Sequence, residues 1–250
     1  MSSATAAEHA RLFIEARNSH QGVDWRRFTP LDADTAYAIQ DATLAQIGPI
    51  GGWKVGSKGA GTQASCAPLP AAGIYASGSV LSGPQWSRRA IEAELAFRLG
   101  KDFDPGDRLP SREELLDAFD AMLPLIEVVE TRLAATPCEE PLVSLADLLS
   151  HGALVLGKAV PLPAEAPDVR KLTATLFFDD KQVEHMTGTN PAGDIWPMLA
   201  WLARHCSLRG VPLKKGQIVT TGTCTGVQNA VAGQKVKAVL EGVGEVSFSF

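Results

Sequence analysis

The stretch Ile91-Glu92-Ala93-Glu94-Leu95-Ala96-Phe97-Arg98-Leu99 decides the fold that we expect for this chain. It is rich in large apolar residues and has no clean helical stripe, whereas its alternation with a period of two predicts a strand. On such a strand, Glu92 and Glu94 point to one face and the apolar side chains point to the other. Two neighbouring carboxylates on an apolar strand repel each other and lose hydration. A shared proton, a basic side chain or a divalent cation therefore has to compensate them.

A third carboxylate, Glu127, lies in a similar setting within Leu123-Pro124-Leu125-Ile126-Glu127-Val128-Val129. Three carboxylates from two strands, with room left for water or substrate, suit the hard cations Mg²⁺ and Mn²⁺. The alternative is a solvated sheet face on which the acids pair with Arg88, Arg89 or Arg132. The spacing alone leaves both interpretations open.

Composition narrows the class of protein. The 250 residues are 45% hydrophobic, which is enough for one large domain or two small ones. A net charge of −5 with scattered Lys and Arg argues against a nucleic-acid partner. The sequence contains neither an 18-residue apolar run nor a secretory-signal pattern, so we expect no membrane contact. The cysteines lack Cys-x-x-Cys spacing, which indicates reduced thiols in a cytoplasmic protein (Cys66, Cys138, Cys206 and Cys224).

The pattern along the chain predicts strands that do not alternate regularly with helices. A capping box at Ser111 begins one helix that Pro124 ends, and Asn190 can cap another. Residues 59–74 resemble a long loop. We therefore expect an α+β fold, with a large mixed or antiparallel sheet around the acid-bearing strands, rather than a doubly wound fold. The predicted helices are 4–17, 34–47, 111–122, 144–150 and 191–206, and the predicted strands are 73–80, 91–99, the run around Glu127, 153–157, 172–178, 181–186, 217–221, 234–240 and 245–250.

Two glycine-rich stretches each allow two interpretations. Residues 51–59 contain Lys54 but lack the order of a P-loop. They form either a tight turn with a solvent-exposed lysine or a backbone that brings amides and one cation to an anionic ligand. Residues 220–227 are rich in hydroxyls and glycine. They form either an ordinary β-turn or a turn that presents amides and hydroxyls to a carboxylate or enolate.

Six pieces of sequence, in the same order along the chain, resemble the fumarylacetoacetate hydrolase superfamily. The similarity is to its branch of 2-oxopent-4-enoate hydratases and 4-oxalocrotonate decarboxylases. The pieces are Ala36–Ala42, Gly52–Gly56, Glu92–Glu94, the run around Glu127, Trp201–Gly216 and Thr221–Val227. The resemblance implies a mixed β-sheet roll with an N-terminal helical segment and helices packed outside. Residues 1–72 would form the helical and loop region, and residues 73–250 the catalytic roll.

The resemblance also implies a site. It assigns Mg²⁺ or Mn²⁺ to Glu92, Glu94 and Glu127, and it makes Lys54 an active-site residue that supports proton transfer or binds an oxyanion. It adds substrate contacts from a serine and from the glycine-rich turn (Ser150, Thr221, Gly222 and Thr223). The expected ligand is a small 2-oxo acid, and the family implies a homo-oligomer.

The function implied by the resemblance is that of a metal-dependent hydro-lyase, similar to 2-oxopent-4-enoate hydratase, in the catabolism of aromatic or related compounds. A decarboxylase or a C–C bond hydrolase of a related oxo acid is the alternative within enzymes. A catalytically idle relative that only binds ligand is the alternative outside them.

Three departures from the family pattern lie on the substrate side of the expected site. The hydratases carry an acidic "PDYG"-like segment where this chain has Pro70-Ala71-Ala72-Gly73. Their "GHP" histidine is replaced by Asn190. Their "ADNAS" segment reads Ala146-Asp147-Leu148-Leu149-Ser150, which loses the Asn and keeps Ser150. The three expected metal ligands are all present.

Overall fold

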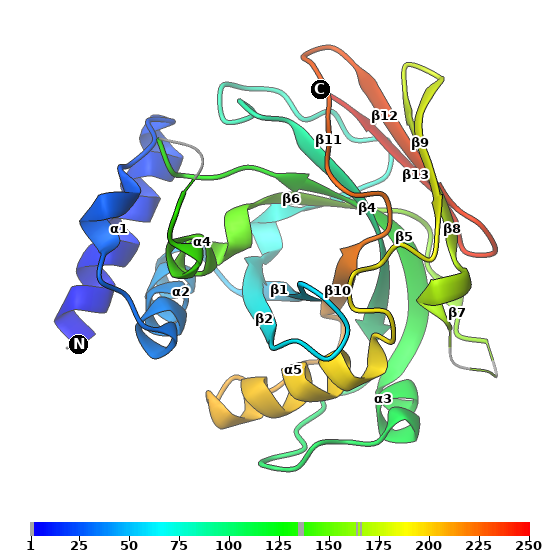
Figure 1. Cartoon of the computed structure of the whole chain (residues 1–250), viewed down its shortest axis with the longest axis horizontal. Coiled ribbons are helices and arrows are strands. Elements are labelled where there is room, and N and C mark those ends of the chain that lie inside the picture. The colour runs from blue at the N-terminus through cyan, green and yellow to red at the C-terminus, as the bar shows by residue number, and fades with distance from the viewer. Residues whose placement is uncertain (1–2, 135–137, 164, 166) are drawn as a thin grey trace.

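A computed structural model describes residues 3–134, 138–163, 165 and 167–250 (Figure 1). Two sheets form its centre, and helices lie around them. Among the described residues, no helix has the length and apolar character needed to cross a membrane.

The larger sheet has nine strands in the order β2-β1-β10-β4-β5-β6-β3, with β11 paired to β4 and β7 paired to β5. β1 runs parallel to β10, whereas β4 runs antiparallel to both β10 and β5. The acid-bearing β4 is therefore a central strand. The bounds are β1 Ile50–Ser57, β2 Ala64–Pro70, β3 Ile74–Ala76, β4 Ala90–Leu99, β5 Phe119–Val129, β6 His151–Leu156, β7 Val160–Pro161, β10 Ile218–Thr223 and β11 Gln228–Asn229.

The smaller sheet is antiparallel, with the order β13-β12-β8-β9, and it packs across β4 and β5. Its inward side chains, such as Leu176 and Val236, join Phe97 of β4 in the main hydrophobic core. This apolar face of β4 is the one that the alternation in residues 91–99 predicts. The bounds are β8 Thr173–Phe178, β9 Lys181–Thr187, β12 Lys235–Leu240 and β13 Gly244–Ser249.

Helices cover the larger sheet in two groups (Figure 1). The helices α1, α2 and α4 lie together at one end, and α5 packs on β1 and β2 with α3 beside it. Asp32 caps α2 by accepting from the Thr35 amide, and Ser111 and Glu114 form the expected capping box of α3. The bounds are α1 Ser3–Ser19, α2 Ala33–Ile47, α3 Arg112–Ala118, α4 Pro141–Ala146 and α5 Trp196–Leu208, with 3₁₀ turns η1 Trp25–Phe28, η2 Ala71–Gly73, η3 Leu148–Ser150 and η4 Val169–Lys171.

The predicted helix 111–122 is wrong in its second half. The helix ends at Ala118, and β5 begins at Phe119 and continues through Pro124. Pro124 is tolerated there because it lies between the segment of β5 that pairs with β7 and the segment that pairs with β6. Pairing along the whole of β4 overrides the local helical signal.

Four other local predictions also differ from the structure. Residues 59–74 do not form one long loop, because β2 occupies 64–70 and pairs with β1. The glycine-rich stretch from residue 51 is mostly strand β1 rather than a tight turn. Residues 191–195 precede α5, and Asn190 does not cap that helix. The short helix expected at 144–150 is α4 followed by η3, so it begins earlier and contains a kink.

The fold class is confirmed as a mixed sheet system with outer helices. Strands on both sides of residue 72 belong to the nine-stranded sheet, and the proposed division at that residue stays a prediction. The homo-oligomer and the cytoplasmic location stay predictions too.

Candidate metal and active site

Three carboxylates meet on one face of the larger sheet. Glu92 and Glu94 come from β4, and Glu127 comes from β5 directly opposite Glu92. One ligand oxygen from each lies within 4.8 Å of the others. Glu94 is 2% exposed and Glu127 is fully buried. Three acids this close repel one another strongly unless a positive charge joins them.

Burial sets the protonation of this group. Burial first, and then the charge of Glu127, raise the pKa of Glu92 to about 7. The same causes, with Glu92 added, raise the pKa of Glu94 to about 8. Burial also opposes ionisation of Glu127, but the adjacent Lys54 ammonium and His151 outweigh it and lower the pKa of that carboxyl. Glu127 is therefore the one of the three that ionises most readily.

Lys54 supplies the positive charge. It lies on β1 beside β10, and its side chain is 13% exposed. Its Nζ donates to Glu127 Oε1 at 2.6 Å and to the Leu149 carbonyl at 3.1 Å. Burial lowers the pKa of Lys54, but Glu127 and the two other acids more than compensate and raise it. The structure thus corrects the interpretation of Lys54 as a solvent-exposed residue and leaves it charged beside the acids.

A strained turn brings two more groups to Glu127. Leu148, Leu149 and Ser150 all have positive φ, between 51° and 58°. Backbone strain of this kind costs about 1–3 kcal/mol per residue. In this conformation the Leu149 carbonyl reaches Lys54, and His151, the residue after the turn, places Nδ1 3.3 Å from Glu127 Oε1. Burial lowers the pKa of His151 to about 4, so the imidazole is neutral at pH 7.

A buried ion pair between Arg132 and Asp147 stabilises the strained turn. Arg132 Nε donates to Asp147 Oδ1 at 2.5 Å, and its two Nη atoms donate to the carbonyls of Asp147 and His151. Both residues are at most 6% exposed. The guanidinium therefore ties together the two ends of the segment that presents Leu149 and His151 to the site.

The hydroxyl-rich turn at residues 220–227 contacts Glu94. Gly222, with φ of +90°, donates its amide to Glu94 Oε2 at 2.9 Å, a conformation that favours glycine. Asn190 Nδ2 donates to the carbonyls of Thr221 and Gly222 and thereby fixes this turn. The residue that departs from the family histidine is thus used to position the backbone next to a carboxylate.

The remaining expected substrate contacts have different surroundings. The Thr221 hydroxyl is fully buried and donates to the Leu95 carbonyl. The Thr223 hydroxyl donates to the Gly226 carbonyl at 3.3 Å. It also bonds Glu92 and offsets a small part of the rise in the pKa of that carboxyl. Ser150 belongs to the strained turn. Their substrate roles stay predictions.

Sequence reasoning missed His151, Leu149 and the Arg132–Asp147 pair. The usable signal for His151 was its place at the start of the strand that neighbours Glu127. The alternative in which the acids pair with arginines is wrong. Arg132 pairs with Asp147, and the backbone amides of Arg88 and Arg89 donate hydrogen bonds to Glu130.

The donor set fits a hard divalent cation. Glu127 Oε2 is buried and has no hydrogen-bond partner among the described residues. A buried carboxylate oxygen without a partner is costly, and a cation between the three acids would satisfy it. All-oxygen donation of this kind suits Mg²⁺ or Mn²⁺.

The raised pKa values predict how pH affects the metal-free protein. Folded Glu92 and Glu94 retain protons that the unfolded chain releases above its ordinary carboxyl pKa of 4.5. Stability of the metal-free fold should therefore fall as pH rises from about 5 to about 8. Excess Mg²⁺ should reduce this fall, because it binds the ionised form. Melting temperatures measured across that range with EDTA and with Mg²⁺ test this, and two parallel curves would contradict it.

A comparison with protein-family models identifies the family of this chain. The fumarylacetoacetate (FAA) hydrolase C-terminal family model matches residues 62–249, which is most of the chain. The protein therefore belongs to the fumarylacetoacetate hydrolase family, and the resemblance seen in the sequence is confirmed.

Two proteins named as hydratases are similar to this chain in sequence. A 2-keto-4-pentenoate hydratase of Paraburkholderia xenovorans (strain LB400) is 29% identical over 160 residues, which are 64% of this chain and 58% of that protein. The matched part thus spans just over half of that relative. The 2-keto-4-pentenoate hydratase 2 of Dechloromonas aromatica (strain RCB) is 27% identical over 263 residues, covering 98% of this chain and 97% of that protein.

A solved structure matches the whole fold. The 4-oxalocrotonate decarboxylase from Pseudomonas putida G7, complexed with magnesium and adipate, has a TM-score of 0.86 and 20% identity. The match covers 100% of this chain and 98% of that one. At this identity the likeness shows the shared fold.

Proposed function

We propose that this protein is a divalent-cation-dependent hydro-lyase acting on a small 2-oxo or 2-hydroxydienoic acid in the catabolism of aromatic or related compounds. One observation carries the proposal. Three carboxylates lie within 4.8 Å, and a buried lysine lies 2.6 Å from one of them. The names of the sequence relatives, which are hydratases of 2-keto-4-pentenoate, support the substrate class.

Glu92, Glu94 and Glu127 would hold the cation, which is Mg²⁺ or Mn²⁺. When bound, such a cation supplies Lewis-acid stabilisation of the negative charge that develops on a 2-oxo acid during enolisation. The chain's own contribution is an environment poor in water, because two of the acids are almost fully buried. Burial strengthens each electrostatic interaction with the substrate.

Lys54 would take part in proton transfer to or from the substrate. An ammonium has three N–H donors, and two of them are directed to Glu127 and to the Leu149 carbonyl. The third is available to a substrate oxyanion or to the carbon that gains a proton. The neutral His151 imidazole and the strained turn hold Glu127 and the ammonium in place.

Proton exchange provides the first test. In D₂O with Mg²⁺, the protein should exchange the C3 protons of 2-oxobutanoate for deuterium, and loss of their ¹H NMR signal measures the rate. Exchange should stop when EDTA removes the cation. An idle relative would bind 2-oxobutanoate and leave its C3 protons in place, which would contradict the proposal.

Decarboxylation is the second candidate function, and one structural observation favours it. The segment that carries an acid in the hydratases begins here with the exposed Ala71 of η2. Loss of CO₂ needs an electron sink and one returning proton, whereas hydration also needs a water delivered to the distal double bond. Product analysis distinguishes the two. A hydratase converts 2-hydroxypenta-2,4-dienoate, and a decarboxylase releases CO₂ from 4-oxalocrotonate.

A further inference from the structure

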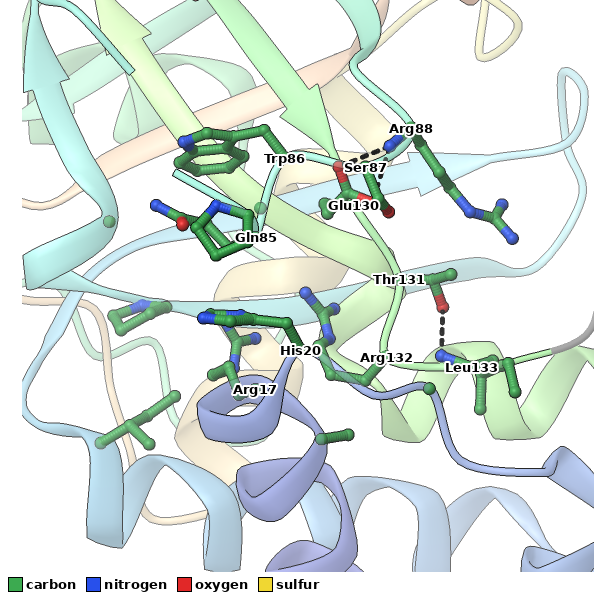
Figure 2. A pocket seen from close by; sticks show the side chains of 18 of the residues that line it. Arg17, His20, Gln85, Trp86, Ser87, Arg88, Glu130, Thr131, Arg132 and Leu133 are labelled. Carbon is green, nitrogen blue, oxygen red and sulfur yellow. Dashed lines mark hydrogen bonds between the residues drawn. The ribbon is translucent and has the colours of Figure 1, made fainter. Parts of the chain in front are cut away.

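A pocket lies between the end of α1 and the segment that follows β5 (Figure 2). Its volume is about 490 Å³, which is the size of a small-molecule site. The three site carboxylates and Lys54 are not among the residues that line it. Gly73 and Gly152 form part of its wall, and a Cβ on Gly73 would lie 3.3 Å from Nε2 of the buried His151. The residues that line this pocket therefore differ from the carboxylates and lysine of the carboxylate site.

Two guanidiniums lie together in this pocket, and only one of them is paired. Figure 2 shows Arg17 of α1 beside Arg132. All three nitrogens of Arg132 donate to Asp147 or to the His151 carbonyl. In contrast, Arg17 Nε is buried without a hydrogen-bond partner, and Arg17 forms no ion pair with any residue that the structure describes. Asp147 attracts Arg17 only from a distance, because Arg132 and Thr131 occupy its two oxygens.

The unpaired charge is energetically unfavourable. Burial, and then the nearby charge of Arg132, lower the pKa of Arg17 to about 9. The guanidinium is still charged at pH 7, and it is half-buried, with a buried Nε that has no partner among the described residues. An anion or a strong acceptor beside this N–H group would satisfy the donor and offset the loss of hydration.

The one acid in the pocket is engaged elsewhere. Glu130 is 5% exposed and accepts the Ser87 hydroxyl at 2.7 Å and the amides of Arg88 and Arg89. Its carboxylate thus faces the loop before β4 rather than Arg17. It also makes the pocket unfavourable for a multiply charged anion, because it adds a negative charge to the wall.

The rest of the wall combines apolar and aromatic side chains with the polar His20, Gln85 and Ser87. Trp86 and Leu133 are at most 6% exposed, and Tyr75 and Ile47 complete this surface. Apolar walls with a few polar groups are typical of sites for organic ligands.

We propose that this pocket binds a small monocarboxylate with an apolar or aromatic body, with the carboxylate paired to Arg17. Arginine suits this role because its fork of N–H donors matches a carboxylate in a bidentate pair. The ring or chain of the ligand would then lie against Trp86 and Leu133. This ligand is additional to the 2-oxo acid of the carboxylate site.

Benzoate is a suitable probe. Its binding to the full-length protein is measured by titration calorimetry with Mg²⁺ and saturating oxalate present, so that a chelating dicarboxylate occupies the carboxylate site. Benzoate should bind under these conditions, and its neutral analogue benzamide should bind at least about tenfold more weakly, as expected for loss of a charge-assisted pair.

Variants assign the effect to one residue. Arg17→Met should weaken benzoate binding at least about tenfold, and Arg17→Lys, which keeps the charge but not the fork, should lie between. Arg11→Met is the matched control, because Arg11 lies on the same helix, is 68% exposed and pairs with Glu15 on the surface. It should leave benzoate affinity unchanged. In crystals of the wild-type protein, the bromine of 4-bromobenzoate should give an anomalous peak in the pocket.

Three results would overturn the inference: equal benzoate affinity in wild type and Arg17→Met, displacement of benzoate by oxalate, or a bromine peak elsewhere. Oxalate binding is a separate readout. If oxalate fails to bind while benzoate still depends on Arg17, the proposed function fails and this inference stands.

Discussion

Replacement of Lys54 by methionine is expected to slow C3 proton exchange of 2-oxobutanoate by about 10²–10⁴-fold, the usual contribution of a positioned acid or base. Lys54 Nζ contacts Glu127 and is the one ammonium that the structure places beside the three acids within its described residues. Methionine keeps the length of the side chain and removes its proton and charge.

Cation binding should respond in the opposite sense. The ammonium competes with a divalent cation for Glu127, so the affinity of Lys54→Met for Mg²⁺ should be equal to or tighter than that of wild type. Without the cation, the buried Glu127 carboxylate loses its partner, which should cost about 3–5 kcal/mol of unfolding free energy. Added Mg²⁺ should restore that loss.

Lys58 provides the matched control for this variant. It follows β1 and is exposed. Lys58→Met should therefore exchange C3 protons at the wild-type rate and melt at the wild-type temperature. Wild-type exchange by Lys54→Met with normal Mg²⁺ affinity would remove Lys54 from the chemistry.

The second large effect concerns Glu94→Gln. The amide oxygen of glutamine can still accept the Gly222 amide, which now lies 2.9 Å from Glu94 Oε2. The variant therefore keeps the local structure and loses one ligand charge. Its affinity for Mg²⁺ should fall by more than the factor of about 10–100 that loss of an outer partner of a metal ligand costs, and C3 exchange should fall with it.

The same substitution should stabilise the metal-free fold. Folding raises the pKa of Glu94 from its ordinary value of 4.5 to about 8, so the cost of ionising this carboxyl in the metal-free fold grows as pH increases from about 5 to about 8. The gain in melting temperature of Glu94→Gln over wild type should grow over that range. Glu245→Gln, at an exposed position of β13, should change neither property. Unchanged Mg²⁺ affinity in Glu94→Gln would contradict the assignment of this residue as a ligand.

Sequence alone predicted the parts of the site that depend on a local period. The alternation in residues 91–99 correctly placed Glu92 and Glu94 on one face, because both faces of β4 are set by side chains two residues apart. The apolar run around Glu127 correctly predicted a second strand, and pairing brought it opposite Glu92.

Sequence could not predict the parts that depend on pairing between distant segments. Nothing local shows that residues 119–124 extend β5, or that the glycine-rich stretch at Lys54 becomes a strand beside β10. Glycine there allows close approach, since a Cβ on Gly52 would lie 2.5 Å from the Ile218 carbonyl oxygen. Local turn chemistry therefore favoured a loop, whereas long-range pairing determined the result.

The role of His151 was hidden for a related reason. A single histidine at the start of a strand has no ligand spacing of its own. It reaches Glu127 only because three successive residues adopt positive φ and Arg132 and Asp147 hold that turn. Leucine at 148 and 149 gives no local signal for such a conformation.

The position of the cation tests the central claim most directly. Crystals grown with Mn²⁺ and oxalate, measured near the manganese absorption edge, should show one strong anomalous peak among the carboxylates of Glu92, Glu94 and Glu127, with oxalate beside it and within reach of Lys54. A manganese peak held by other residues, or no peak at this site at saturating Mn²⁺, would contradict the account.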